Sequence, residues 1–168
     1  MRSGDPIALI QKYRRKGLLV DSNLLLLFLV GSFDSSLIEK FKRTRASGFT
    51  TDDFELLTRI MAQFEKIVTT PHILTEVSNL STFKGITKMD YFQRFGISIL
   101  SFDEQTVPSK NFCHKAYFCA FGLKDAAIAH IAKNNYLVLT AEFALSNYLQ
   151  KSGIDAINFN HLRQHVWS

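Results

Sequence analysis

Short apolar runs alternate with longer helix-like segments along the chain, and this alternation constrains its fold more than any other sequence feature. Five segments are predicted to be strands: Leu18–Val20, Lys66–Thr69, Ile97–Phe102, Leu137–Leu139 and Ala156–Phe159. Alternating strands and helices are typical of parallel sheets, because each helix carries the chain back to the edge where the next strand begins. The sequence therefore predicts an α/β fold: a three-layer sandwich with a central, mostly parallel, five-stranded sheet.

The segment Ser35–Phe64 interrupts this alternation with two predicted amphipathic helices, LIEKFKRT and DDFELLTRIMAQF. Ala46–Gly48 separates them, and Thr50 or Thr51 is expected to cap the second helix. We therefore expect a helical hairpin over residues 35–64. The 168 residues fit a single domain, 1–168, because they are too few for two ordinary domains and a linker.

Four acidic residues lie where the ligand sites of parallel sheets are found. In open α/β sheets, ligands bind outside the carboxyl ends of the strands. Asp21 directly follows the first predicted strand, and Glu142 lies two residues past the end of LVLT. Glu76 lies less than two turns into the helix after the second strand, and Asp125 begins the helix that leads into the fourth. The four carboxylates can therefore meet at one edge of the sheet.

Each acid also has an ordinary structural explanation when it is considered alone. Asp21 and Asp125 could cap helices, Glu142 could complement a helix dipole, and Glu76 could be a solvated helix charge. The joint pattern favours a cation site, because crowded carboxylates repel one another unless they are protonated or neutralised. Oxygen ligands without His or Cys are typical of Mg²⁺ or Mn²⁺ sites.

Three segments resemble, in the same order, the successive motifs of PIN domains. They are LLVDSNLLL, PHILTEVSNL and GLKDAAIAHIAKNNYLVLTAEFALSNYLQKSGIDAINFN, and they are spread over nearly the whole chain. Asp21, Glu76 and Asp125 match the first three acids of the family. Thr140, followed two residues later by Glu142, resembles the fourth motif, in which the acid is more often Asp.

The resemblance implies a hydrolase that cuts phosphodiester bonds in single-stranded RNA, with water activated on one or two Mg²⁺ or Mn²⁺ ions. Asp21 and Asp125 would be direct metal ligands, and Glu76 would position an ion or its water. Asn23 and Thr140 would orient carboxylates and waters around the ions. The fourth acid, Glu142, would bind an ion directly, through water, or not at all.

A non-catalytic PIN-like module that binds RNA or a protein is the alternative from another functional class. All four acidic positions are filled, which argues against a decayed site. Within the nuclease interpretation, the chain resembles stand-alone PIN toxins that a small antitoxin holds inactive, and an RNA-processing enzyme is the other role left open. The resemblance also implies a homodimer, formed through apolar helix surfaces that leave the acidic edge free.

The net charge of +5 fits a polyanionic partner such as RNA. Basic residues concentrate in Lys12–Lys16 and Lys40–Arg45, although solvated helix faces would explain these clusters equally well. The apolar run Leu24–Val30 is too short to span a bilayer, and the first apolar stretch precedes its basic cluster, the reverse of a secretory signal. We therefore expect a cytoplasmic protein without a membrane segment.

Overall fold

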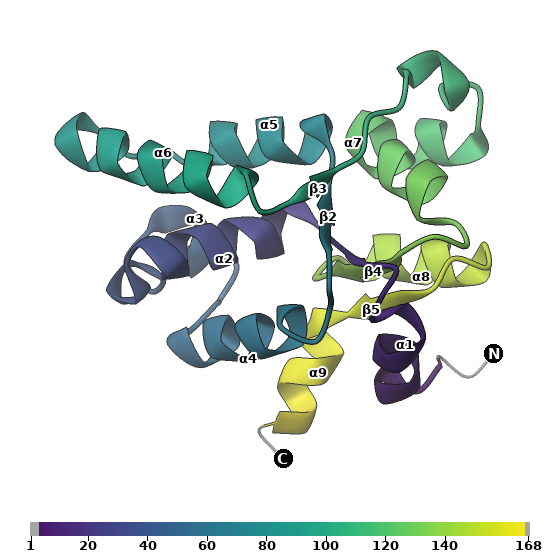
Figure 1. Ribbon diagram of the computed structural model, residues 1–168, viewed down its shortest axis with the longest axis horizontal. Helices are drawn as coiled ribbons and strands as arrows, with labels where there is room; N and C mark the ends of the chain where they lie inside the picture. The colour runs from purple at the N-terminus through teal and green to yellow at the C-terminus, as the bar shows by residue number, and fades with distance from the viewer. Residues whose placement is uncertain (1–3, 167–168) are drawn as a thin grey trace.

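The computed structural model describes residues 4–166 and contains a five-stranded sheet (Figure 1). Neighbouring strands all run parallel, in the order β3-β2-β1-β4-β5. The strands are β1 (Leu18–Val20), β2 (Ile67–Thr69), β3 (Asp103–Glu104), β4 (Leu137–Thr140) and β5 (Ala156–Asn158). The predicted α/β fold with a parallel sheet is confirmed.

The central position of β1 follows from its side chains. Leu18, Leu19 and Val20 are fully buried, as expected for a strand covered by helices on both faces. Leu19 aligns with Val68 of β2 on one side and with Val138 of β4 on the other. This register brings the carboxyl ends of β1, β2 and β4 to one edge of the sheet, which we call the carboxyl edge.

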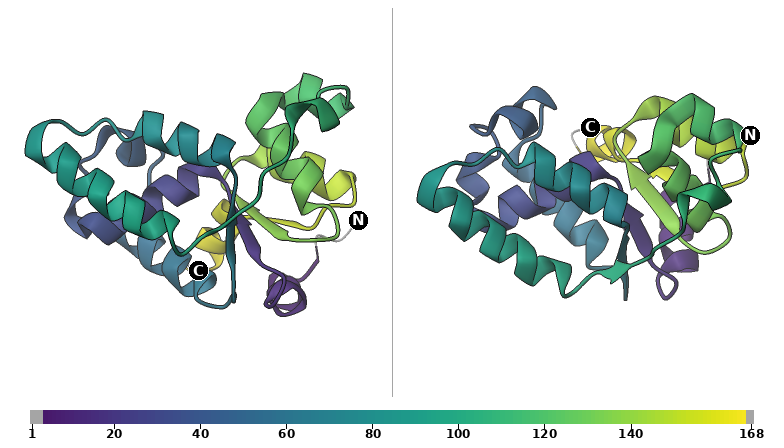
Figure 2. Two further views of the ribbon diagram at one scale, coloured as in Figure 1. Left: turned by 45° about the horizontal axis from the view of Figure 1, so that its top comes forward. Right: turned by 90° about the horizontal axis from the view of Figure 1, so that it is seen from above.

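Helices cover both faces of the sheet (Figures 1 and 2). One side carries α2 (Ser22–Phe33), α3 (Lys42–Ala46), α4 (Thr51–Met61), α5 (Pro71–Leu80) and α6 (Gly85–Ile99). The other side carries α1 (Pro6–Tyr13), α7 (Ala116–Ala132) and α8 (Phe143–Lys151), while α9 (Phe159–Val166) follows β5. Short 3₁₀ turns form at η1 (Ser35–Leu37) and η2 (Ser109–Asn111). Within residues 4–166, no helix has both the length and the apolar composition needed to cross a membrane.

The helix α2 is apolar nearly all round and lies in the middle of the larger helical layer. Leu24–Leu27 are buried, and the helix packs on α4, α5 and α6. A helix that is hydrophobic on every side is stable when it is enclosed in this way. A Cβ at Gly31 would collide with the ring of Phe54, so the glycine lets α4 approach α2 closely. This packing fixes the first residue after β1, Asp21, at the carboxyl edge.

The third strand was predicted in the wrong place. The prediction put it at Ile97–Phe102, but α6 continues to Ile99 and the strand comprises only Asp103–Glu104. Over so short a run, apolar residues fit the helical period as well as the strand period. In the structure Ile97 is exposed, whereas Ile99 and Phe102 pack against the core.

The predicted hairpin of residues 35–64 forms only in its second half. Thr50 caps α4: its hydroxyl oxygen accepts the backbone N–H of Asp53, whose carboxylate accepts the backbone N–H of Thr50. The first predicted helix is instead broken into η1 and the short α3. The buried hydroxyl of Thr44, within α3, donates to the backbone oxygen of Ile38, the residue that follows η1. Such side-chain bonds compete with helical backbone bonds, which explains the break.

The two basic clusters lie away from the carboxyl edge. Lys12–Lys16 directly precedes β1 and therefore lies at the opposite edge, where Lys12 pairs with Asp155 at 2.8 Å. Lys40–Arg45 follows α2, which starts at the carboxyl edge and runs for 12 residues. At 1.5 Å per residue, this helix is roughly 18 Å long, and the chain leaves its far end before it reaches the second cluster.

Candidate active site

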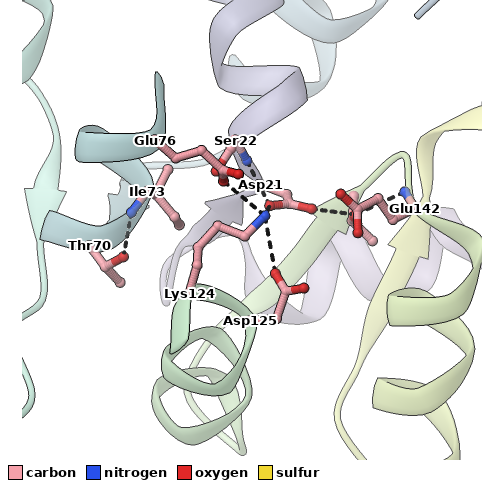
Figure 3. A network of polar contacts seen from close by, with 9 residues as sticks. Asp21, Ser22, Thr70, Ile73, Glu76, Lys124, Asp125 and Glu142 are labelled. Atoms are coloured by element: carbon pink, nitrogen blue, oxygen red, sulfur yellow. Dashed lines mark hydrogen bonds and ion pairs between the residues drawn. The ribbon is translucent and has the colours of Figure 1, made fainter. Parts of the chain in front are cut away.

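Four acidic side chains reach the carboxyl edge from four different elements (Figure 3). Asp21 is the N-cap of α2, directly after β1, and Glu76 lies in the second turn of α5. Asp125 lies in the first turn of α7 after Gly122, whose φ of 81° breaks that helix. Glu142 is the residue before α8, two positions after β4.

Lys124 fills the space between three of these acids. Its Nζ lies 2.9 Å from Asp21 Oδ1, 3.1 Å from Glu76 Oε2 and 3.1 Å from Asp125 Oδ1. The exposed fraction of the Lys124 side chain is 18%, against 2% for Asp21 and 10% for Asp125. The ammonium therefore neutralises carboxylates that would otherwise repel one another.

Asp21 is held from two sides. Its Oδ1 accepts the backbone N–H of Ser22 at 2.7 Å, and its Oδ2 accepts the hydroxyl of Thr140 at 2.7 Å. The Thr140 oxygen in turn accepts the backbone N–H of Glu142 at 3.0 Å. Asp21 therefore caps α2 and belongs to the acidic cluster at the same time, so the two explanations considered for it from the sequence apply together.

Two oxygens that face Lys124 make no directed hydrogen bond. Glu76 Oε2 and Asp125 Oδ1 are buried atoms without a hydrogen-bond partner among the described residues, although each lies 3.1 Å from the Lys124 Nζ. An ion pair needs only proximity, whereas a hydrogen bond also needs direction. These oxygens are thus arranged around a point of positive charge, as oxygen ligands are around a metal ion.

Burial and neighbouring charges shift the pKa of three groups in the site. Burial raises the pKa of Asp125 despite the nearby ammonium of Lys124, and the charges of Asp21 and Glu76 raise it further. Burial and the charge of Asp21 also raise the pKa of Glu142. Burial alone would lower the pKa of Lys124, but the charges of Asp21 and Asp125 outweigh it and raise that pKa. Lys124 is therefore a full positive charge at neutral pH.

The remaining predicted site residues differ in how closely they join the cluster. Thr140 holds Asp21, as described above. Glu142 lies beyond Asp21 as seen from Lys124 (Figure 3), and among the described residues Lys124 pairs only with the other three acids. Asn23 is the second residue of α2, and within residues 4–166 it makes no hydrogen bond to a site acid. The structure thus brings three acids together, with Glu142 near them.

Lys124 was missed from the sequence. It directly precedes Asp125 in the run GLKD, and only the aspartate of this run was considered as a site residue. One signal was present: after the break at Gly122, Lys124 lies in the first turn of a helix, where the helix dipole disfavours a positive charge. A residue that opposes a local preference in this way often serves a site.

The donor set suits a hard divalent cation, provided that Lys124 moves aside. The three central ligands are carboxylates, the donors that Mg²⁺ and Mn²⁺ prefer. With the ammonium between them, no three Asp, Glu, His or Cys side chains in the described part of the chain stand together as a ready metal site. A divalent ion and the ammonium would therefore compete for the same three carboxylates.

The sequence matches no protein-family model, and it matches no curated protein. The structure itself shows an α/β protein with a parallel sheet and an acidic cluster at the carboxyl edge.

Proposed function

We propose that this protein is a metal-dependent ribonuclease of the PIN-domain type, which hydrolyses phosphodiester bonds in single-stranded RNA. One observation carries the proposal: Asp21, Glu76 and Asp125 surround a single positive charge at the carboxyl edge of a parallel sheet. Ligand sites of such sheets are found at this edge. The order of the PIN-like motifs along the sequence supports the same proposal.

The residues of the site would divide the work between them. Asp21, Glu76 and Asp125 would hold Mg²⁺ or Mn²⁺, and Glu142 would reach it through water. A divalent ion in such a site supplies an activated water and shields the charge of the phosphate. The hydroxyl of Thr140 keeps Asp21 oriented for this task before any ligand arrives.

A non-catalytic PIN-like module that binds RNA or a protein is the second candidate. The observation in its favour is Lys124, whose ammonium already satisfies three carboxylates without a metal. The two candidates differ in one property. A ribonuclease requires a divalent ion to displace the ammonium, whereas a binding module does not.

A cleavage assay tests the proposed activity. We expect the purified protein to cut single-stranded RNA when Mg²⁺ or Mn²⁺ is supplied, because these ions activate water and shield phosphate charge. Excess chelator should stop the cutting, and added Mn²⁺ should restore it. The measurement is the appearance of shorter fragments on a denaturing gel. A protein that binds RNA yet cuts none with either ion would be the binding module instead.

Two biological roles fit the proposed activity. The protein would act either as the toxin of a toxin–antitoxin pair, blocked by a small antitoxin protein, or as an RNA-processing enzyme. Both roles place it in the cytoplasm. A short open reading frame immediately beside the gene would favour the toxin.

We also propose a homodimer, formed through the outer face of α6. Four apolar side chains of this segment are 57% to 87% exposed, at a spacing that places them on one helical face: Ile86, Met89, Ile97 and Leu100. Because β3 follows α6, this helix ends at the edge opposite the acids, which leaves the carboxyl edge free. We expect sedimentation to show a dimer that Met89→Lys with Ile97→Lys converts to a monomer, whereas Ile7→Lys on α1 leaves it intact. A monomeric parent at high concentration would contradict this proposal.

A further inference from the structure

A pocket of about 420 Å³ opens beside the acidic cluster, between α5 and α7. This volume lies within the range of small-molecule sites, roughly 300–1,000 Å³. Glu76 and Lys124 line the pocket and also belong to the acidic cluster. A group bound in the pocket would therefore lie next to the carboxylates that hold the proposed metal.

The lining of this pocket suits a flat ring with polar edges. Pro71, Leu80 and Leu123 supply apolar surface, and the side-chain amide of Asn79 supplies both a donor and an acceptor. The Nδ1 atom of His72 is buried without a hydrogen-bond partner among the described residues. A nucleobase combines apolar faces with an edge of donors and acceptors, and so matches both kinds of lining.

The connection between β3 and the second half of α7 brings basic residues, without acidic ones, to the side of the pocket. It leaves the carboxyl edge after Glu104 and returns there before Asp125, so both of its ends lie beside the site. Residues 105–124 contain no Asp or Glu. Their basic residues are Lys110, His114, Lys115 and Lys124.

Phe112 ties this connection to the pocket. Its side chain is fully buried, and the centroid of its ring lies 6.4 Å from that of His72, which lines the pocket. Lys110, His114 and Lys115 lie within three residues of Phe112, and all are exposed. Charge complementarity therefore favours a polyanion along the connection.

We propose that the pocket between α5 and α7 holds the base of one nucleotide next to the cut bond, while the backbone of the same RNA strand follows residues 105–124. The choice of RNA as ligand rests on the proposed ribonuclease function. An acidic peptide would also match the lysines, but it would leave the apolar walls and the Asn79 amide unused. RNA uses both.

Leu123→Ala and Asn79→Ala test the pocket without requiring cleavage. Leu123 is 43% exposed and Asn79 lies on the surface, so both variants are expected to fold. In excess chelator, each should bind a fluorescent single-stranded RNA about fivefold more weakly than the parent, at the low end of what one stacked base contributes. Ile7→Ala is the matched control: Ile7 is 66% exposed but lies on α1, which leads to the start of β1 at the opposite edge, so the affinity of this variant should be unchanged.

A pair of lysine variants tests the path of the backbone. Lys115→Gln should weaken RNA binding and flatten the dependence of affinity on salt, because one phosphate contact fewer releases fewer counterions. Lys42→Gln removes another exposed charge, from α3, and it should leave both quantities unchanged. If the parent cleaves RNA, sequencing the cut ends of a random pool should show a base preference beside the cut that Leu123→Ala weakens.

The outcomes separate this proposal from the proposed activity. Unchanged RNA affinity in both pocket variants would overturn the pocket, even for a protein that cleaves RNA. Binding of polyglutamate with no binding of RNA would also overturn it. Weaker RNA binding by the pocket variants, with the Ile7→Ala control unaffected, would support the pocket even if no RNA is cut, and only the ribonuclease proposal would then fail.

Discussion

Asp21→Asn is expected to slow RNA cleavage by at least about a thousandfold. A divalent ion contributes several kcal/mol to such a transition state, and each factor of ten corresponds to about 1.4 kcal/mol. The substitution keeps the shape of the side chain but removes the charge that holds the ion. The amide oxygen can still accept the Ser22 N–H, so α2 stays capped. The measurement is the single-turnover rate at saturating Mn²⁺, with circular dichroism as the check on folding.

Asp155→Asn is the matched control for this variant. Asp155 is also an ion-paired aspartate: its Oδ2 accepts from Lys12 Nζ and from the Tyr13 hydroxyl, both at 2.8 Å. Because this pair lies at the opposite edge of the sheet, we expect parental cleavage. Asp21→Asn should also bind RNA at least as tightly as the parent, since one negative charge near the phosphates is gone. Parental cleavage by Asp21→Asn would remove Asp21 from the proposed site.

The order of the elements could be predicted because the inner strands are recognisable in the sequence as short apolar runs. β1 is wholly apolar and is followed by Asp21, and β4 is apolar up to its last residue, Thr140; both strands are buried. β3 gives no such signal. It consists of Asp103 and Glu104, which join the sheet by backbone pairing with Val68 and Thr69 of β2. Backbone pairing of two polar residues leaves no recognisable pattern in the sequence. The apolar run before them does form a strand-like pattern, and the strand was therefore predicted there.

The acidic cluster could be predicted in part for a similar reason. Topology alone places the residue after β1 and the residues after β4 at the carboxyl edge, so Asp21 and Glu142 were expected there. The position of Lys124 depends instead on the turn at Gly122, which sets how α7 resumes. A sequence shows that a glycine can break a helix, but it does not show the direction in which the next side chain points.

Lys124→Met is expected to destabilise the metal-free protein. Methionine has a similar length but no charge, so Asp21, Glu76 and Asp125 lose the cation that they share. Removing one partner of a buried ion pair costs about 3–5 kcal/mol. Because the side chain of Glu76 is 44% exposed, solvent screens part of this effect, and we expect a loss of about 2 kcal/mol in the free energy of unfolding. Denaturant unfolding in excess chelator measures it.

The same variant is expected to bind Mn²⁺ about tenfold more tightly than the parent, because the ion no longer has to displace an ammonium or approach its charge. Calorimetric titration measures the affinity, and Mn²⁺ should then restore more stability to Lys124→Met than to the parent. Lys115→Met, which removes an exposed lysine of the same connection, should change neither quantity. If Lys124→Met loses stability but binds no divalent ion, the three acids are arranged for Lys124 alone, and the binding module becomes the better proposal. If the variant binds the ion tightly, the carboxylates form a cation site that the lysine occupies until a metal arrives.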